Sequence, residues 1–65
     1  MNWKKIIKRE LRACGGECRS EVLRESILRA VSARYGANMV TTERVERALA
    51  NDRRLTLDGG IARLV

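Results

Sequence analysis

The last third of the chain constrains the fold most, because a predicted helix leads directly into a predicted hairpin there. Residues 42–51 have the apolar spacing of an amphipathic helix, and residues 54–65 alternate apolar and polar side chains around Gly59-Gly60. Two consecutive glycines readily take the positive φ values that a two-residue type I′ turn requires. A lone hairpin is not stable in water, so this one must pack against the helical remainder of the chain.

A turn at Gly59-Gly60 also sets the register of the two strands, since side chains alternate between the two faces of a sheet. The register predicts two pairs on the inner face and one on the outer face. The inner pairs are Leu55 with Leu64 and Leu57 with Ala62, and the outer pair is Thr56 with Arg63.

The N-terminal segment is predicted to form a helix over about residues 3–14 with one apolar and one basic face. The apolar arc contains Trp3, Ile6, Ile7, Leu11 and Cys14, and the opposite arc contains Lys5, Lys8, Arg9 and Arg12, with Lys4 at its edge. Gly15-Gly16 should end this helix, because glycine forms a left-handed helix cap at low cost. Trp3, the first apolar residue of the helix, is expected in the core.

Two further helices are predicted over about residues 20–35, with Ser20 as N-cap, and 42–51, with Thr41 or Thr42 as N-cap. The core positions are Leu23, Ile27, Ala30 and Val31 in the second helix, with Leu28 and Tyr35 at its margin, and Val45, Ala48 and Leu49 in the third. Gly36 is expected to end the second helix. Three helices followed by a C-terminal hairpin (54–65) predict an α+β fold, a small winged helix, with residues 1–65 as a single domain.

Charge points to the class of partner. The 65 residues contain 14 Lys and Arg against 8 Asp and Glu, a formal charge of +6, which favours a polyanionic partner. Apolar runs are far shorter than the roughly 20 residues of a membrane span, and no signal-peptide core follows the first lysines. We therefore expect a soluble, intracellular monomer that binds DNA or RNA and has no contact with a membrane.

The positive surplus is concentrated in residues 1–20, which carry six basic residues against two acidic ones. We therefore expect the first helix to be the main nucleic-acid-binding surface, with low sequence specificity. The predicted site contains Lys4, Lys5, Lys8, Arg9, Arg12, Arg44, Arg47, Arg54 and Arg63. Base readout by the third-helix arginines, with Arg53 and Arg54, is a second hypothesis. We favour the alternative that Arg47 pairs with Glu43, four residues earlier in the same helix, and does not contact bases. The alternative for the first helix is that its basic face binds no partner and only keeps the protein soluble.

Other functional classes have little support in the sequence. The chain has no histidine and no phosphate-binding glycine loop, so we expect neither an enzyme nor a cofactor. Cys14 and Cys18 are separated by three residues and have no further cysteine or histidine to complete a zinc site. We expect no bound metal and two reduced thiols, with an internal disulfide as the alternative. A module that docks an acidic protein partner is the second functional hypothesis.

Three segments resemble a known family: residues 2–11 (NWKKIIKREL), residues 23–28 (the spacing Leu-x-x-x-Ile-Leu) and the closing Arg63-Leu64-Val65. The chain resembles, over nearly its whole length, the C-terminal winged-helix domain of the LYAR family of cell growth-regulating nucleolar proteins. The resemblance implies a nuclear or nucleolar module if the source is eukaryotic, and it would place an acidic protein partner in nuclear or ribosome-assembly complexes. For any other source, the expectation of an intracellular protein gives the cytoplasm. The family's hairpin is lysine-rich, whereas this loop is Asp58-Gly59-Gly60, so the likeness supplies no site residues.

Overall fold

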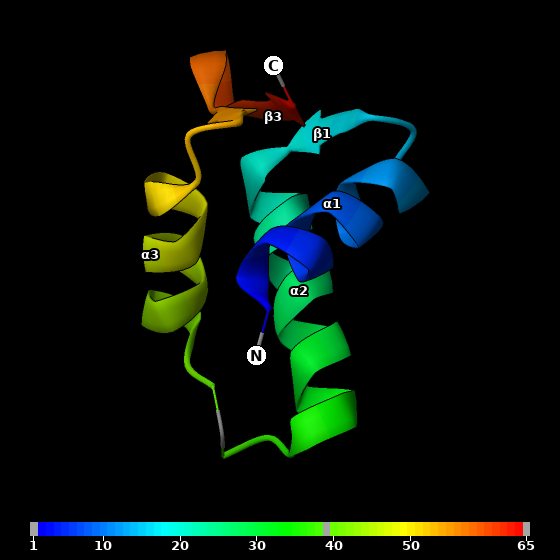
Figure 1. Cartoon of the computed structure of the whole chain (residues 1–65), viewed down its shortest axis with the longest axis vertical. Helices are drawn as coiled ribbons and strands as arrows, with labels where there is room; N and C mark the ends of the chain where they lie inside the picture. Colours follow the sequence, from blue (N-terminus) through cyan, green and yellow to red (C-terminus); the bar gives the residue numbers. More distant parts are fainter. Residues whose placement is uncertain (1, 39, 65) are drawn as a thin grey trace.

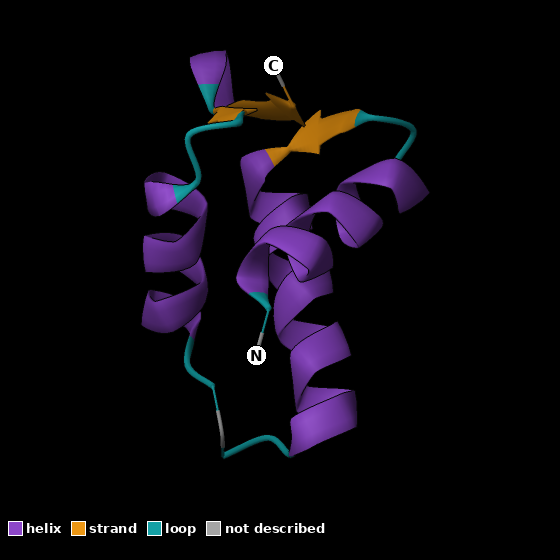
Figure 2. Ribbon diagram, in the orientation of Figure 1, coloured by secondary structure: helices purple, strands orange, loops and turns teal. Residues whose placement is uncertain are grey.

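The computed structural model describes residues 2–38 and 40–64. It contains helices α1 (Trp3–Ala13), α2 (Ser20–Tyr35) and α3 (Thr42–Asn51), strands β1 (Glu17–Arg19), β2 (Leu55–Thr56) and β3 (Ile61–Leu64), and the short 3₁₀ helix η1 (Asp58–Gly60). Helix α1 crosses α2, and the sheet lies across one end of the helices (Figures 1 and 2). The predicted α+β class is confirmed. Val65, which falls in the predicted hairpin, lies outside the described residues, as do Met1 and Met39.

The ends of α1 follow from its flanking residues. Asn2 caps the N-terminus, because its side-chain oxygen accepts a hydrogen bond from the backbone N–H of Lys5 at 3.2 Å. At the other end Gly15 and Gly16 have φ values of 89° and 97°, and the N–H of Gly16 donates to the carbonyl of Leu11 at 3.0 Å. This glycine pair ends the helix as predicted, because few other residues adopt positive φ without strain.

The cap predicted for α2 is wrong, whereas one of the two caps predicted for α3 is present. Ser20 is the first residue of α2, and the N-cap is Arg19, whose side chain makes no capping hydrogen bond. For α3, the hydroxyl oxygen of Thr41 accepts from the backbone N–H of Arg44 at 3.2 Å. Serine is also well suited to the first turn of a helix, so residue type alone did not separate the two positions.

Strand β1 lies between the first two helices and was not predicted from the sequence. The strand pairs antiparallel with β3, which places Cys18 opposite Ala62 and makes β3 the central strand in the order β1-β3-β2. Three residues with the sequence Glu-Cys-Arg contain too little alternation to signal a strand. Their pairing depends on β3, about forty residues later in the chain, which no local pattern indicates.

The hairpin register is confirmed for two of the three predicted pairs, Leu55 with Leu64 and Thr56 with Arg63. The prediction for Leu57 is wrong: this side chain is 42% exposed and lies outside the strands. Its ψ of 37° is not extended, so the chain leaves the ladder there and enters η1. Gly59 and Gly60 have the predicted positive φ values, 58° and 78°.

The core is aliphatic and draws on all three helices and the sheet. Its buried members are Ile7, Leu11, Leu23, Ile27, Val31, Val40, Val45, Leu49, Leu55 and Ala62. Trp3, Ile6, Leu28 and Ala48 are partly buried against this cluster, so Trp3 occupies the margin of the core and not its centre. Val40, which precedes α3, was not predicted as a core residue. No helix in the described parts of the chain is long and apolar enough to cross a membrane.

Candidate nucleic-acid interface

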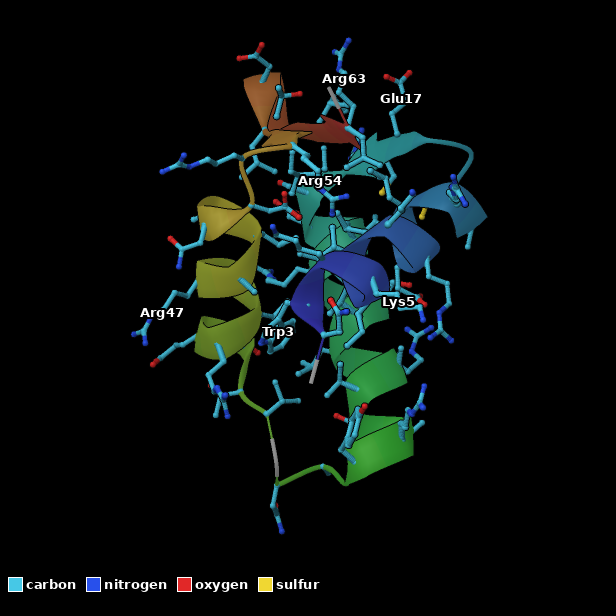
Figure 3. All side chains as sticks on the ribbon, viewed as in Figure 1. Trp3, Lys5, Glu17, Arg47, Arg54 and Arg63 are labelled. Atoms are coloured by element: carbon cyan, nitrogen blue, oxygen red, sulfur yellow. The ribbon has the colours of Figure 1, made fainter. Side chains whose placement is uncertain are left out.

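The outer face of α1 carries five basic residues within nine positions, here called the α1 basic stripe: Lys4, Lys5, Lys8, Arg9 and Arg12. Because the apolar residues of α1 face the core, Lys5, Lys8, Arg9 and Arg12 lie on the opposite arc of the helix, and Lys4 lies at the edge of that arc, beside Trp3 and Ile7. Four of the five residues are exposed, and Lys8 is half-buried. Figure 3 shows Lys5 on the side of α1 away from α3.

Among residues 2–38 and 40–64, no acidic side chain forms an ion pair with the α1 basic stripe, although the charge of Lys4 interacts with the Asp52 carboxylate. Glu10, the one acidic residue of α1, accepts a hydrogen bond from the hydroxyl of Ser26 on α2 at 2.6 Å, so its carboxylate is directed toward α2. The ion pairs within the described ranges 2–38 and 40–64 join Arg24 to Glu46, Arg54 to Asp52 and Arg63 to Glu17, and none includes a residue of the stripe. The stripe therefore presents a concentrated positive field to solvent.

Helix α3 has a different charge arrangement from the one its sequence suggested. Glu46 pairs with Arg24 of α2 at 2.7 Å, on the flank of α3 that faces α2. No ion pair joins Glu43 to Arg47 in the part of the chain that the structure describes, so the predicted intrahelical pairing is wrong. Arg44 and Arg47 are both exposed, and Arg47 extends outward from α3 in Figure 3.

A groove of about 330 Å³ lies between the start of α1 and α3. It is lined by Trp3, Lys4 and Ile7 from α1, by Arg44, Arg47, Ala48 and Asn51 from α3, and by Asp52. We call it the α1–α3 groove. It brings together three of the predicted site residues, Lys4, Arg44 and Arg47, which belong to two different helices. Its apolar residues were not predicted as part of a site, because the sequence does not show how α1 and α3 pack relative to each other.

Arg54 is engaged in contacts within the fold. Its backbone N–H donates to Oδ1 of Asp52 at 2.9 Å, its guanidinium lies 3.5 Å from the same carboxylate, and its Nη2 donates to the backbone carbonyl of Lys4 at 3.4 Å. Burial of the Asp52 carboxyl would raise its pKa, but the hydrogen bonds and charge of Arg54, with the charge of Lys4, lower the pKa overall. Asp52 therefore stays ionised and holds Arg54, whose guanidinium links the turn after α3 to α1.

Arg63 stands apart from the other predicted site residues. It lies on β3 opposite Glu17 of β1, and its Nε is 3.8 Å from a carboxylate oxygen of that residue. Figure 3 shows Arg63 and Glu17 together at the sheet end of the molecule, away from Trp3 and Arg47. Its charge is thus opposed by a nearby carboxylate, unlike the charges of the α1 basic stripe.

The two cysteines are free thiols that flank the turn between α1 and β1, and both are half-buried. Burial raises the pKa of the Cys18 thiol to about 11, and a hydrogen bond with the neighbouring Cys14 thiol adds to the shift. Cys18 is therefore protonated and weakly nucleophilic at neutral pH. No cluster of three or more metal-ligating side chains occurs among residues 2–38 and 40–64.

Comparison with known proteins adds no assignment: no family model, no curated protein and no solved structure matches this chain. Functional inference therefore depends on the arrangement of the residues described above.

Proposed function

We propose that this chain is a winged-helix module that binds duplex DNA or structured RNA through the α1 basic stripe, with low sequence specificity. The observation that carries the proposal is that no ion pair among the described residues includes the stripe, combined with the hydrogen bond that directs Glu10 to Ser26. The order of elements supports the winged-helix part. A strand lies between α1 and α2, and a hairpin follows α3 and joins that strand in one antiparallel sheet.

The stripe has dimensions suited to a nucleic-acid backbone. Residues four positions apart in a helix are about 6 Å apart along its axis, so Lys4, Lys8 and Arg12 span about 12 Å, similar to the width of the B-DNA major groove. Contacts of this kind recognise phosphates, which are the same for every base sequence. We therefore infer that the stripe positions the module on a duplex and supplies little discrimination between sequences.

Other parts of the molecule contribute less to this activity. The loop Asp58–Gly60 carries one acidic residue and no basic residue, so it offers no attraction for phosphate. Arg44 and Arg47 remain candidates for base contacts, since the pairing of Glu46 with Arg24 removes one carboxylate from their side of α3. Glu43 stays exposed on the same helix and would repel phosphates there.

The proposal is tested by the salt dependence of binding to a fluorescent duplex. About four phosphate contacts predict a slope of log K against log salt of roughly −3 to −4, with micromolar affinity. The variant K5A/R9A/R12A should lose about three contacts and bring the slope close to −1. The matched control R29A/R34A/R53A removes the same charge from positions outside the stripe and should change the slope much less.

Two results would contradict the proposal. One is the absence of duplex binding at low salt. The other is an equal loss of affinity in the stripe variant and the control, because it would show that net charge alone drives association.

A further inference from the structure

The α1–α3 groove combines an apolar floor with a cationic rim. Ile7 is fully buried and Trp3 and Ala48 are half-buried, so these three form its deeper part. Lys4 and Arg47 are exposed and lie at its edges. A surface that is apolar at its base and positive at its edges favours a ligand that is apolar at one point and negative around it.

The one acidic residue that lines the groove does not cancel this positive rim. Asp52 is 6% exposed, and its carboxylate is held by Arg54, so its charge is compensated within the fold. The rim cations Lys4 and Arg47, together with Arg44, therefore set the sign of the field at the mouth of the groove.

The apolar floor distinguishes between two anionic ligand classes. A duplex presents phosphates to a protein surface, while the flat faces of its bases stay stacked inside, so it has nothing to place against Trp3 and Ile7. An acidic peptide with one large apolar side chain offers both kinds of group. The volume of about 330 Å³ is at the lower end for ligand pockets, which suits one anchoring side chain.

We propose that the α1–α3 groove binds an acidic segment of a partner protein. One aromatic or large aliphatic side chain of that segment packs against Trp3 and Ala48, and flanking carboxylates pair with Lys4 and Arg47. Lys4 belongs both to this groove and to the α1 basic stripe, whereas Lys5 and Trp3 lie on opposite sides of α1 (Figure 3). The groove is therefore tested through Trp3 and Arg47, which lie outside the stripe, and duplex binding is tested through Lys5, Arg9 and Arg12, which do not line the groove.

Trp3 provides a direct probe, because it is the single tryptophan of the chain and lines the groove. The titrant is a short peptide of Asp and Glu with one central Phe, and its control is the same peptide with Gly in place of Phe. We expect a saturable change in Trp3 emission with the Phe peptide and a much weaker one with the Gly peptide. The variant Arg47→Glu should weaken Phe-peptide binding about tenfold, since repulsion replaces an exposed attraction.

The matched control is Arg29→Glu, which makes the same change in net charge on the exposed face of α2. It should leave peptide binding within about twofold, since Arg29 does not line the groove and salt screens the field of an exposed charge. Neither arginine has an ion pair within residues 2–38 and 40–64, so both variants should fold like the wild type.

Three results would overturn the proposal. They are equal binding of the Phe and Gly peptides, equal weakening by Arg47→Glu and Arg29→Glu, and a Trp3 response to a single-stranded oligonucleotide but not to the Phe peptide. The last result would assign the groove to an unstacked nucleobase. Duplex binding by K5A/R9A/R12A is measured separately and does not affect these outcomes.

Discussion

The turn between α3 and β2 is held by a buried carboxylate, and its removal should destabilise the whole domain. Asp52 has a side chain that is 2% exposed, and it accepts the backbone N–H of Arg54 at 2.9 Å. The contacts from the Arg54 guanidinium are longer, at 3.5 Å, and that side chain is 43% exposed. The short bond to the backbone should therefore carry most of the stabilisation.

These distances predict that Asp52→Ala lowers the free energy of unfolding more than Arg54→Ala does. Asp52→Ala loses a charge-assisted hydrogen bond and leaves a backbone N–H without its partner, which should lower the free energy of unfolding by about 2 kcal/mol. For a domain of this size that corresponds to a fall in Tm of roughly 8–16 °C. Arg54→Ala removes only the longer, partly exposed contacts and should lower the free energy of unfolding by about 0.5–1 kcal/mol.

The pH dependence gives an independent check. The pKa of Asp52 is lower in the folded chain than in the unfolded chain, so the unfolded chain binds the proton more tightly. The contribution of Asp52 is therefore fully present above its ordinary pKa and is lost as pH falls through the folded-state value. The stability difference between wild type and Asp52→Ala should be largest near neutral pH and shrink in strong acid.

Thermal and urea unfolding followed by circular dichroism would measure these differences, with Arg53→Ala as a control at an exposed neighbouring position. The reasoning is refuted if Asp52→Ala is no more destabilising than Arg53→Ala. It is also refuted if Arg54→Ala costs as much as Asp52→Ala, because the side-chain contacts would then carry the stabilisation.

Two further predictions concern the core and the thiols. Leu23 is fully buried and Val22 is 49% exposed, so Leu23→Ala should lower the free energy of unfolding in urea by about 2–5 kcal/mol and Val22→Ala by less than about 0.5 kcal/mol. Similar losses for the two variants would contradict this difference in burial. Because the pKa of Cys18 rises from 9.0 to about 11, its alkylation by iodoacetamide at pH 8 should be about tenfold slower in the folded protein than in denaturant, since the thiolate is scarcer but more nucleophilic. Peptide mass would measure the rates, and equal rates would contradict the raised pKa.

Local signals predicted the helices well: the apolar periodicity is clear in α1 and α3, and glycines stand where α1 and α2 end. The apolar positions of α1 recur at helical spacing, and the glycines after it end it at the expected place. The hairpin register was also predictable, since Gly59-Gly60 sets the turn and the pleat fixes which side chains face each other. These features depend on residues that are close in sequence.

The missed features depend on residues that are far apart in sequence. Strand β1 forms because β3 offers it an edge, and Glu17 to Arg19 have no strand pattern of their own. Leu57 satisfies the alternation of an inner-face residue, but the backbone turns out of the ladder before it. The pairing of Glu46 with Arg24 and the α1–α3 groove arise from the packing of helices, so the sequence predicted the basic residues without their arrangement.

The most direct test of the central claim is an NMR titration of the labelled protein with a duplex of mixed sequence at low salt. The account predicts that the amide signals of residues 4–12 shift most, that the shifts fade as salt is raised, and that a second duplex of different sequence gives the same pattern. Unmoved signals over residues 4–12, while signals elsewhere in the chain shift on binding, would contradict the assignment of the nucleic-acid interface to α1.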